Sequence, residues 1–191
     1  MGEALTLYTG QRGVVLDTLA RDGVYRVKRA YVDQKYGEAA WAFQTAYGFF
    51  CREAAKYLPP PEGAQSPVWL YADPRWADAP ADGALLRVEA PRACALLFDL
   101  RDWNAVLNLS YLPADEADGA AFRAELERQG VSNPLDLFRT GFYPQLKRRV
   151  TGSWERLFRP AGLSPAYTQA ALWELRREWV TSATFHNQPG R

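Results

Sequence analysis

The last part of the chain, residues 167–185, most narrowly limits the folds that this sequence can adopt. A polar residue, Gln169, is followed by the apolar run 170–173, a charged turn at 174–178 and a second run of apolar and β-branched residues. This pattern is typical of two consecutive strands. We therefore expect the chain to end in a closing β-hairpin.

Strand patterns also occur near the beginning and in the middle of the chain, with helix patterns clustered between them. Alternating apolar residues and β-formers predict strands at 5–9, 68–71, 85–89 and 94–98. Periodic apolar residues predict helices at 14–22, 36–58, 99–108 and 117–129, another beginning at 132–134, and a short one at 154–158. Such an order favours an α+β fold over a doubly wound parallel sheet.

Prolines mark the ends of the helical segments. Pro59-Pro60-Pro61 ends the long helix predicted for 36–58 and begins a proline-rich loop at 59–66. Pro144 should kink or end the helix that begins at 132–134.

The bulk properties favour one cytoplasmic domain. A chain of 191 residues can bury one core but is too short for two ordinary domains, so we expect a single domain over 1–191 with a flexible tail at 187–191. The formal net charge of +1, without a charged arm, argues against strong non-specific binding to nucleic acid. The sequence has neither an apolar run of about eighteen residues nor a signal peptide, which predicts a cytoplasmic protein without membrane contact.

The reactive residue types narrow the possible chemistry. The single histidine, His186, makes Ser-His-Asp and Cys-His catalytic groups improbable. Cys51 and Cys94 lie far apart in apolar surroundings, as reduced buried thiols do, and they do not suggest a metal site. The sequence contains no GxGxxG or GxxxxGK[ST] motif. Carboxylates, amides, hydroxyls, arginines and aromatic rings remain, and this set suits a site that binds a nucleotide by stacking and hydrogen bonding.

Most of the chain, from Leu7 to Phe185, resembles the bacterial family called domain of unknown function 3841. The residues that carry this resemblance are Leu7-Tyr8-Thr9, Gln11, Pro67-Val68-Trp69, Asp99, Trp103, Val106-Leu107-Asn108, Ser153-Trp154, Gln169 and Trp173-Glu174-Leu175. The family name implies no activity.

Short segments, in the expected order, also resemble the ADP-ribosyltransferase fold, which implies a split sheet with a helical insertion and an NAD site. Leu7-Tyr8-Thr9-Gly10-Gln11 is similar to the end of the family's first strand, and Trp69-Leu70-Tyr71-Ala72-Asp73 to the middle strand that supplies a stacking aromatic ring. The cofactor-binding residues implied are Tyr8, Thr9, Gln11, Trp69 and Tyr71. Thr9 and Gln11 would hold ribose and carboxamide, and Trp69 or Tyr71 would stack on nicotinamide.

Gln169 occupies the position of the family's catalytic glutamate. That glutamate hydrogen-bonds a ribose hydroxyl and places negative charge near the centre that forms as nicotinamide leaves. An amide can bind the ribose but supplies no charge, so bound NAD should survive longer here. Gln169 is therefore the implied catalytic position.

Two functions of different kinds follow from the resemblance. The first is transfer of ADP-ribose to an unknown protein or nucleic-acid acceptor in a toxin or defence setting. The second is a non-catalytic binding or regulatory module with a degenerate site. Plain structural roles also remain open: Gln169 could be a polar residue at a strand edge, Thr9 and Gln11 could satisfy turn backbone, and Trp69 and Tyr71 could pack the sheet.

A third function, binding to nucleic acid, would use the densest positive cluster of the chain. Its members are Lys147, Arg148, Arg149, Arg156 and Arg159. The same residues could also form a solvated helix face.

Overall fold

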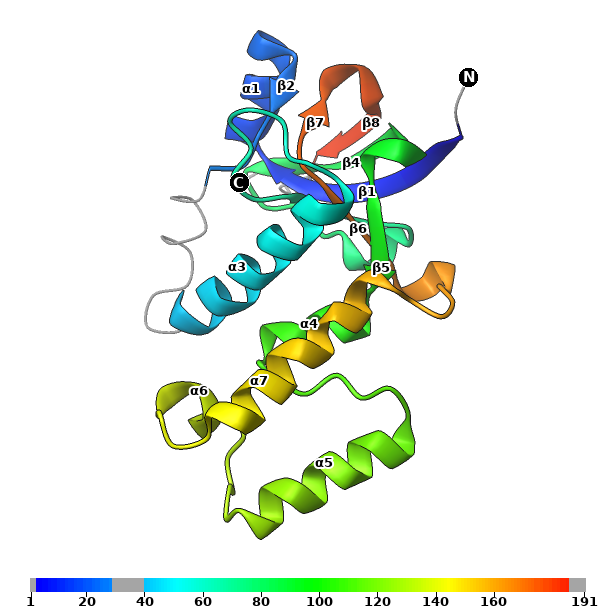
Figure 1. Cartoon of the computed structure of the whole chain (residues 1–191). Helices are drawn as coiled ribbons and strands as arrows, with labels where there is room; N and C mark the ends of the chain where they lie inside the picture. The colour runs from blue at the N-terminus through cyan, green and yellow to red at the C-terminus, as the bar shows by residue number, and fades with distance from the viewer. Residues whose placement is uncertain (1–2, 29–39, 186–191) are drawn as a thin grey trace.

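The computed structural model describes residues 3–28 and 40–185 (Figure 1). The tail expected at 187–191 and the first turn of the predicted helix 36–58 lie outside these residues. None of the helices in the described ranges has the length and apolarity that a membrane crossing needs. Cys51 and Cys94 form no disulfide within the described residues, but both are half-buried, so the expectation that they are buried is wrong.

The centre of the fold is a six-stranded sheet in which every pair of neighbours is antiparallel. The order is β5-β6-β3-β1-β4-β8. The strands are β1 (Ala4–Arg12), β3 (Val68–Tyr71), β4 (Gly83–Pro91), β5 (Leu96–Asp99), β6 (Thr168–Leu172) and β8 (Val180–Phe185). A smaller sheet pairs β2 (Val24–Tyr25) with β7 (Leu175–Arg176). Together with the helices this is an α+β fold, as the sequence predicted.

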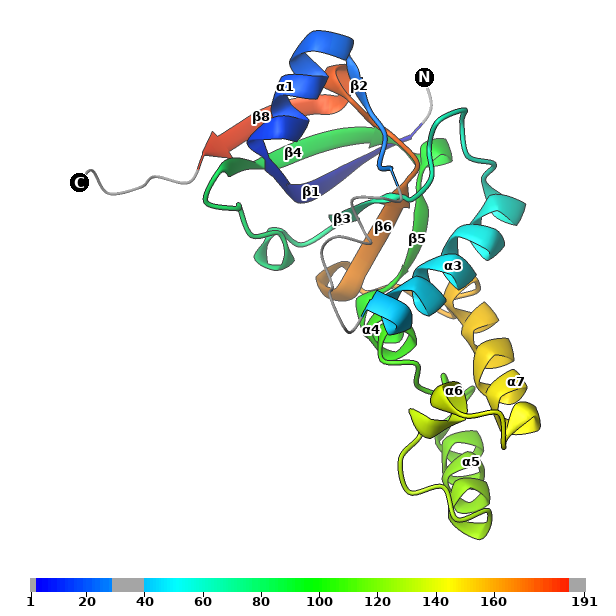
Figure 2. The same cartoon turned by 90° about the vertical axis from the view of Figure 1, so that its left-hand side faces the viewer.

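The closing hairpin expected at 167–185 is wrong, although both of its strands form. β6 lies between β5 and β3, whereas β8 forms the opposite edge of the sheet beside β4 (Figure 2). Burial explains the separation. All five residues of β6 are buried, which requires neighbours on both sides, while β8 is largely exposed and suits an edge.

The helices follow the predicted periodicity in most places. They are α1 (Gly13–Asp22), α3 (Ala40–Tyr57), α4 (Leu100–Leu107), α5 (Glu116–Arg128), α6 (Asp136–Arg139) and α7 (Pro144–Ser153). The helix expected from 132–134 is only the single turn α6. The expectation for Pro144 is wrong, because this residue begins α7. Proline is tolerated at the first helical position, where its missing N–H has no intrahelical partner.

Two apolar clusters lie on opposite faces of the sheet, because successive side chains of a strand alternate between the faces. Leu70 of β3 joins an aliphatic cluster with Val15 and Leu19 of α1. Trp69, its neighbour, packs into an aromatic cluster with residues of α3 and α4. The helices α5, α6 and α7 extend this second cluster away from the sheet (Figure 1).

Candidate functional site

The sheet is weakly joined at one place, between β1 and β3. β1 pairs with β4 along its whole length, from Ala4↔Pro91 to Arg12↔Gly83. In contrast, the register between β1 and β3 has one pair, Tyr8↔Tyr71. The sheet thus consists of two three-stranded halves, β5-β6-β3 and β1-β4-β8.

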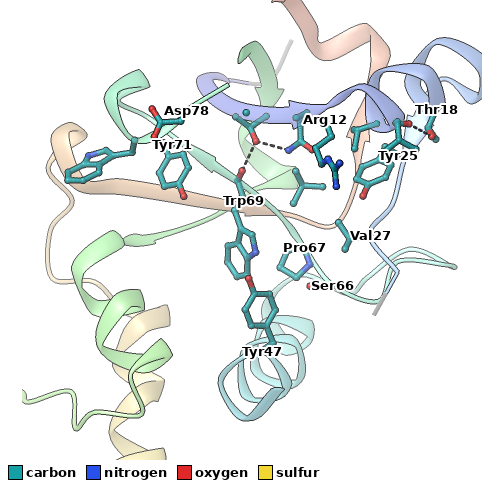
Figure 3. A pocket seen from close by; sticks show the side chains of 18 residues that line it. Arg12, Thr18, Tyr25, Val27, Tyr47, Ser66, Pro67, Trp69, Tyr71 and Asp78 are labelled. Atoms are coloured by element: carbon teal, nitrogen blue, oxygen red, sulfur yellow. Dashed lines mark hydrogen bonds between the residues drawn. The ribbon is translucent and has the colours of Figure 1, made fainter. Parts of the chain in front are cut away.

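A cleft of about 800 Å³ lies beside this junction (Figure 3). Its walls come from the ends of β1 and β3, from α1, from the segment before β3 and from the loop after it. The lining residues are Thr9, Gly10, Gln11, Arg12, Val14, Val15, Thr18, Tyr25, Val27, Tyr47, Ser66, Pro67, Val68, Trp69, Tyr71, Trp76, Ala77 and Asp78. The volume is within the range of about 300–1,000 Å³ that is typical of small-molecule sites.

Thr9 and Gln11, both expected in the site, form a hydrogen-bond chain across the junction. The amide Nε2 of Gln11 donates to Oγ1 of Thr9 at 2.8 Å, and that hydroxyl donates to the backbone carbonyl of Trp69 at 2.9 Å. Thr9 is buried, and its one hydroxyl donor is used in this chain. The chain fixes the amide group of Gln11 at the cleft wall.

Trp69 lines the cleft, but its ring is already stacked. The Trp103 ring lies 4.9 Å from it, centre to centre, at an interplanar angle of 24°. Tyr47 and Phe50 contact it edge-on. Packing of the sheet therefore accounts for the Trp69 ring. Tyr71, which is half-buried, also lines the cleft.

Gln169 and Tyr8 do not line the cleft. Gln169 lies on β6, opposite Tyr71 on one side and Phe98 on the other. Its side chain is 2% exposed, and within the described part of the chain its Oε1 has no hydrogen-bond partner. Tyr8 of β1 stands opposite both Tyr71 and Arg87. The structure thus brings together Thr9, Gln11, Trp69 and Tyr71, and it places Gln169 beside Tyr71 on the neighbouring strand.

Ser66, Trp76 and Asp78 also line the cleft, although no sequence pattern singles them out. Ser66 is 2% exposed, and its Oγ, like the amide oxygen of Gln169, has no partner among the described residues. A buried hydroxyl without a hydrogen bond is costly, at about 1–3 kcal/mol. Folding alone does not account for it.

Gly10 is the one sequence feature that indicates the cleft wall formed by the loop after β3. A Cβ atom at this position would lie 1.8 Å from the backbone oxygen of Asp78. The loop that carries Trp76 and Asp78 therefore passes directly over β1, and only glycine allows that approach.

The charges of the cleft are few. Arg12 and Asp78 are the cation and the carboxylate among its lining residues. Arg12 is exposed and paired with Asp82, with 2.8 Å between Nη2 and Oδ2. The hydrogen bond from Arg12 lowers the pKa of the Asp82 carboxyl, and the attraction of the guanidinium adds to this effect. No group of three or more metal-ligating side chains occurs in the ranges 3–28 and 40–185. This set of groups suits binding by hydrogen bonds and stacking.

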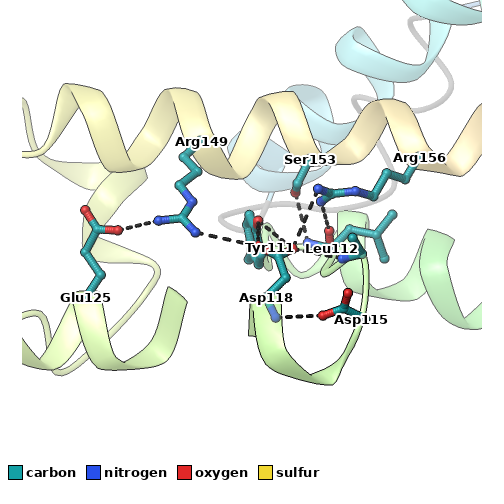
Figure 4. Close-up of polar contacts among 9 residues, drawn as sticks. Tyr111, Leu112, Asp115, Asp118, Glu125, Arg149, Ser153 and Arg156 are labelled. Atoms are coloured by element: carbon teal, nitrogen blue, oxygen red, sulfur yellow. Dashed lines mark hydrogen bonds and ion pairs between the residues drawn. The ribbon is translucent and has the colours of Figure 1, made fainter. Parts of the chain in front are cut away.

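Two arginines of the basic cluster at 147–159 are engaged within the protein (Figure 4). Arg149 forms an ion pair with Glu125 of α5 and lies 3.6 Å from Asp118. Arg156 donates to the backbone carbonyl of Leu112 and also faces Asp118. These two arginines bind α7 and the turn after it to α5. Arg149 and Arg156 are therefore already paired with carboxylates of the chain.

The family model described as Domain of unknown function (DUF3841) matches residues 6–181. The chain belongs to this family. Searches of curated proteins and of solved structures found no match. The DUF3841 match covers the whole lining of the cleft.

Proposed function

We propose that the DUF3841 chain binds NAD or a related nucleotide in the cleft between β1 and β3, and that it is an ADP-ribosyltransferase-like protein. The observation that carries this proposal is that residues of two different strands line one cleft. Thr9 and Gln11 come from one strand and Trp69 and Tyr71 from another, yet all four line the same cleft beside the single-pair junction of β1 and β3. They are four of the six residues that the resemblance implies for the ligand site; the other two, Tyr8 and Gln169, lie outside the lining.

The unpaired polar atoms support a polar ligand. Ser66 Oγ and Gln169 Oε1 are buried without a partner within the described ranges. A ribose presents hydroxyl groups, which can donate to both oxygen atoms. A bound nucleotide would therefore remove a cost that the protein alone carries.

Access to Gln169 depends on Tyr71. The N–H of Ala72 donates to the carbonyl of Thr168, so Ala72 and Thr168 form a hydrogen-bonded pair of the antiparallel ladder. Tyr71 and Gln169, the next pair along the strands, are therefore a non-hydrogen-bonded pair. Side chains lie closer together in such non-hydrogen-bonded pairs. A rotation of the Tyr71 ring would connect Gln169 with the cleft.

NAD would be the donor of the ADP-ribosyl group, and residues of the chain would bind and orient the NAD. Gln11 would hold the carboxamide, and Gln169 would accept a hydrogen bond from a ribose hydroxyl. Because the Gln169 amide carries no charge, we expect slow cleavage that depends on the acceptor, a cytoplasmic protein or nucleic acid in a toxin or defence setting.

A non-catalytic, nucleotide-binding regulatory module is the second candidate. It is favoured by the charges of the site, since Asp78 is the one carboxylate among the lining residues and an amide occupies position 169. This candidate predicts binding without release of nicotinamide.

A ligand-observed NMR titration with NAD tests both candidates, because saturation transfer reports binding and free nicotinamide reports cleavage in the same tube. Gln11→Ala should weaken binding about tenfold, since a charge-neutral hydrogen bond at the wall is lost along with its support of Thr9. Gln129→Ala, an exposed glutamine at the end of α5, is the matched control. Binding with release supports the transferase, and binding without release supports the module. No binding to the folded wild-type chain would reject both.

A further inference from the structure

Trp76 is an exposed aromatic residue at the lip of the cleft. It is 41% exposed, and it lines the cleft together with its neighbours Ala77 and Asp78. Trp69, which the sequence predicted for stacking, is in contrast stacked on Trp103. The exposed part of this indole offers apolar surface to a ligand.

Hydrogen bonds hold the Trp76 indole in place. Its Nε1–H donates to the backbone carbonyl of Ala166 at 2.7 Å. The guanidinium of Arg75 donates to the same carbonyl at 3.2 Å. These two bonds join the loop after β3 to the turn before β6. The indole is therefore anchored at its polar edge.

The backbone beneath Trp76 is also fixed. Residues Pro74–Trp76 form a short 3-10 helix that begins with proline, and the carboxylate of Asp73 caps it by accepting from the N–H of Arg75 at 3.0 Å. Ala77, the next residue, is 4% exposed and anchors the loop in the protein. A ring that is immobilised before binding loses little conformational entropy when a ligand contacts it.

A cation and a second ring complete the arrangement. The guanidinium carbon of Arg75 lies 5.2 Å from the centre of the Trp76 ring and 5.7 Å from that of Tyr167. The two ring centres are 6.1 Å apart. Asp73 neutralises Arg75 at 3.1 Å, so the group offers planar surface rather than net charge. Such a surface suits a flat heteroaromatic ring and not a bare anion.

We propose that Trp76 is the stacking platform of the cleft and binds a flat nitrogen heterocycle, either an adenine base or a nicotinamide ring. The inference rests on the proposed nucleotide site and specifies which residue holds the ring. Stacking of a base on an aromatic side chain is worth enough to be measured by substitution and does not depend on the identity of the base. Trp69 then acts as a packing residue beneath the site.

Two substitutions at Trp76 separate stacking from stability. Trp76→Phe keeps a ring but removes the indole emission, and Trp76→Ala removes the platform. Trp179→Phe is the matched control, because Arg176 lies 5.7 Å over its ring in a similar way and it is not among the lining residues. The probes are NAD, AMP and nicotinamide, each titrated separately while tryptophan fluorescence and ligand saturation transfer are recorded.

We expect NAD to quench the fluorescence of the wild-type chain and of Trp179→Phe, and most of that quenching should be absent in Trp76→Phe. Trp76→Ala should bind NAD about tenfold more weakly, whereas Trp76→Phe should stay within about threefold. AMP and nicotinamide identify the ring that stacks, because only the probe with that ring should lose affinity in Trp76→Ala.

The outcomes separate this inference from the proposed function. If NAD binds Trp76→Ala as tightly as the wild-type chain, the platform is wrong and the NAD site stands. If NAD does not bind but AMP does, with quenching that Trp76→Phe abolishes, the platform stands and the NAD proposal fails. If none of the three probes binds the folded wild-type chain, both are wrong.

Discussion

Buried polar groups are hydrogen-bonded in the helical part of the molecule around α5 and α7. At the cleft between β1 and β3, in contrast, some of them lack a partner within the described ranges. In the helical part, Ser153 is 5% exposed, and its Oγ accepts from the N–H of Leu112 at 2.9 Å while donating to the carbonyl of Val150 at 2.6 Å. In the cleft, Ser66 is 2% exposed, and its Oγ has no partner in the described ranges. The two serines have nearly the same burial and different hydrogen bonding.

This difference distinguishes the polar groups that stabilise the fold from those that do not. Buried polar atoms in native proteins are nearly always paired, and the exceptions need a reason. The network of Ser153, Arg149 and Arg156 connects helices and needs no ligand to explain it (Figure 4). Ser66 Oγ and Gln169 Oε1 make no such connection within the described ranges; Ser66 lines the cleft, and Gln169 lies beside the lining residue Tyr71. Under the proposed function, a ligand would pair these two oxygen atoms.

Removing each serine hydroxyl gives the largest expected contrast. Ser153→Ala should lower the free energy of unfolding by about 1–3 kcal/mol, because it leaves the buried N–H of Leu112 unpaired. Ser66→Ala should leave it unchanged or raise it, because no hydrogen bond is lost and a buried unpaired hydroxyl is removed. Urea unfolding of both variants and the wild-type chain measures the two values.

The same pair tests the cleft. Ser66→Ala should weaken NAD binding, whereas Ser153→Ala should bind NAD normally below its unfolding transition. Equal destabilisation by the two substitutions would mean that Ser66 has a structural partner, and the contrast between the regions would then be lost.

A smaller effect, on the pH dependence of stability, is expected at Asp118 in the helical part. The hydrogen bond from the N–H of Ala114 lowers the pKa of this carboxyl, and the Tyr111 hydroxyl and the nearby arginines act in the same direction. A depressed folded-state pKa stabilises the protein above the ordinary aspartate pKa of about 3.9, and this contribution is lost as the pH falls through the folded-state value.

Asp118→Asn should therefore flatten the acid side of the stability curve. Between about pH 4.5 and pH 2.5 the wild-type chain should lose stability more steeply than the variant, as urea midpoints at successive pH values would show. Asp17→Asn, which changes an exposed carboxylate on α1, should keep the wild-type slope. A parallel decline of the Asp118→Asn and wild-type curves would remove Asp118 from the network.

Much of the fold follows from local patterns in the sequence. Alternation and short apolar runs identified all six strands of the large sheet or their centres, because both patterns are local properties of a strand. The partners of the strands were harder to predict. β6 and β8 are neighbours along the chain but occupy an interior and an edge position, and that choice depends on burial by distant elements. At Pro144 the same residue type fits either the end or the start of a helix, and tertiary packing selects the start.

The site was only partly predictable. The resemblance selected Tyr8, Thr9, Gln11, Trp69, Tyr71 and Gln169, since strand motifs keep their spacing in the sequence. Four of them line one cleft, whereas Tyr8 and Gln169 do not. Ser66 and Trp76 lie in connecting segments, which carry no periodic pattern. Their positions depend on where a loop crosses the sheet. The close approach at Gly10 shows that crossing, but only three-dimensional structure reveals which loop it accommodates.

The smallest change in stability is expected for a substitution of Gln169. This substitution directly tests whether an unpaired buried polar group near the cleft contributes to binding rather than to stability. Gln169→Leu replaces an amide whose oxygen is buried and unpaired within the described ranges with an apolar group of similar size. The free energy of unfolding should therefore stay the same or rise by a few tenths of a kcal/mol. NAD binding should nevertheless weaken, because a ribose hydroxyl would lose its acceptor.

Calorimetric unfolding and an NAD titration on the same sample measure both the stability and the affinity of Gln169→Leu. A substitution that stabilises the fold and lowers the affinity for NAD identifies a polar group that binds the ligand and does not stabilise the fold. If Gln169→Leu instead destabilised the chain and left affinity unchanged, the amide would belong to the fold, and the two regions would no longer differ in kind.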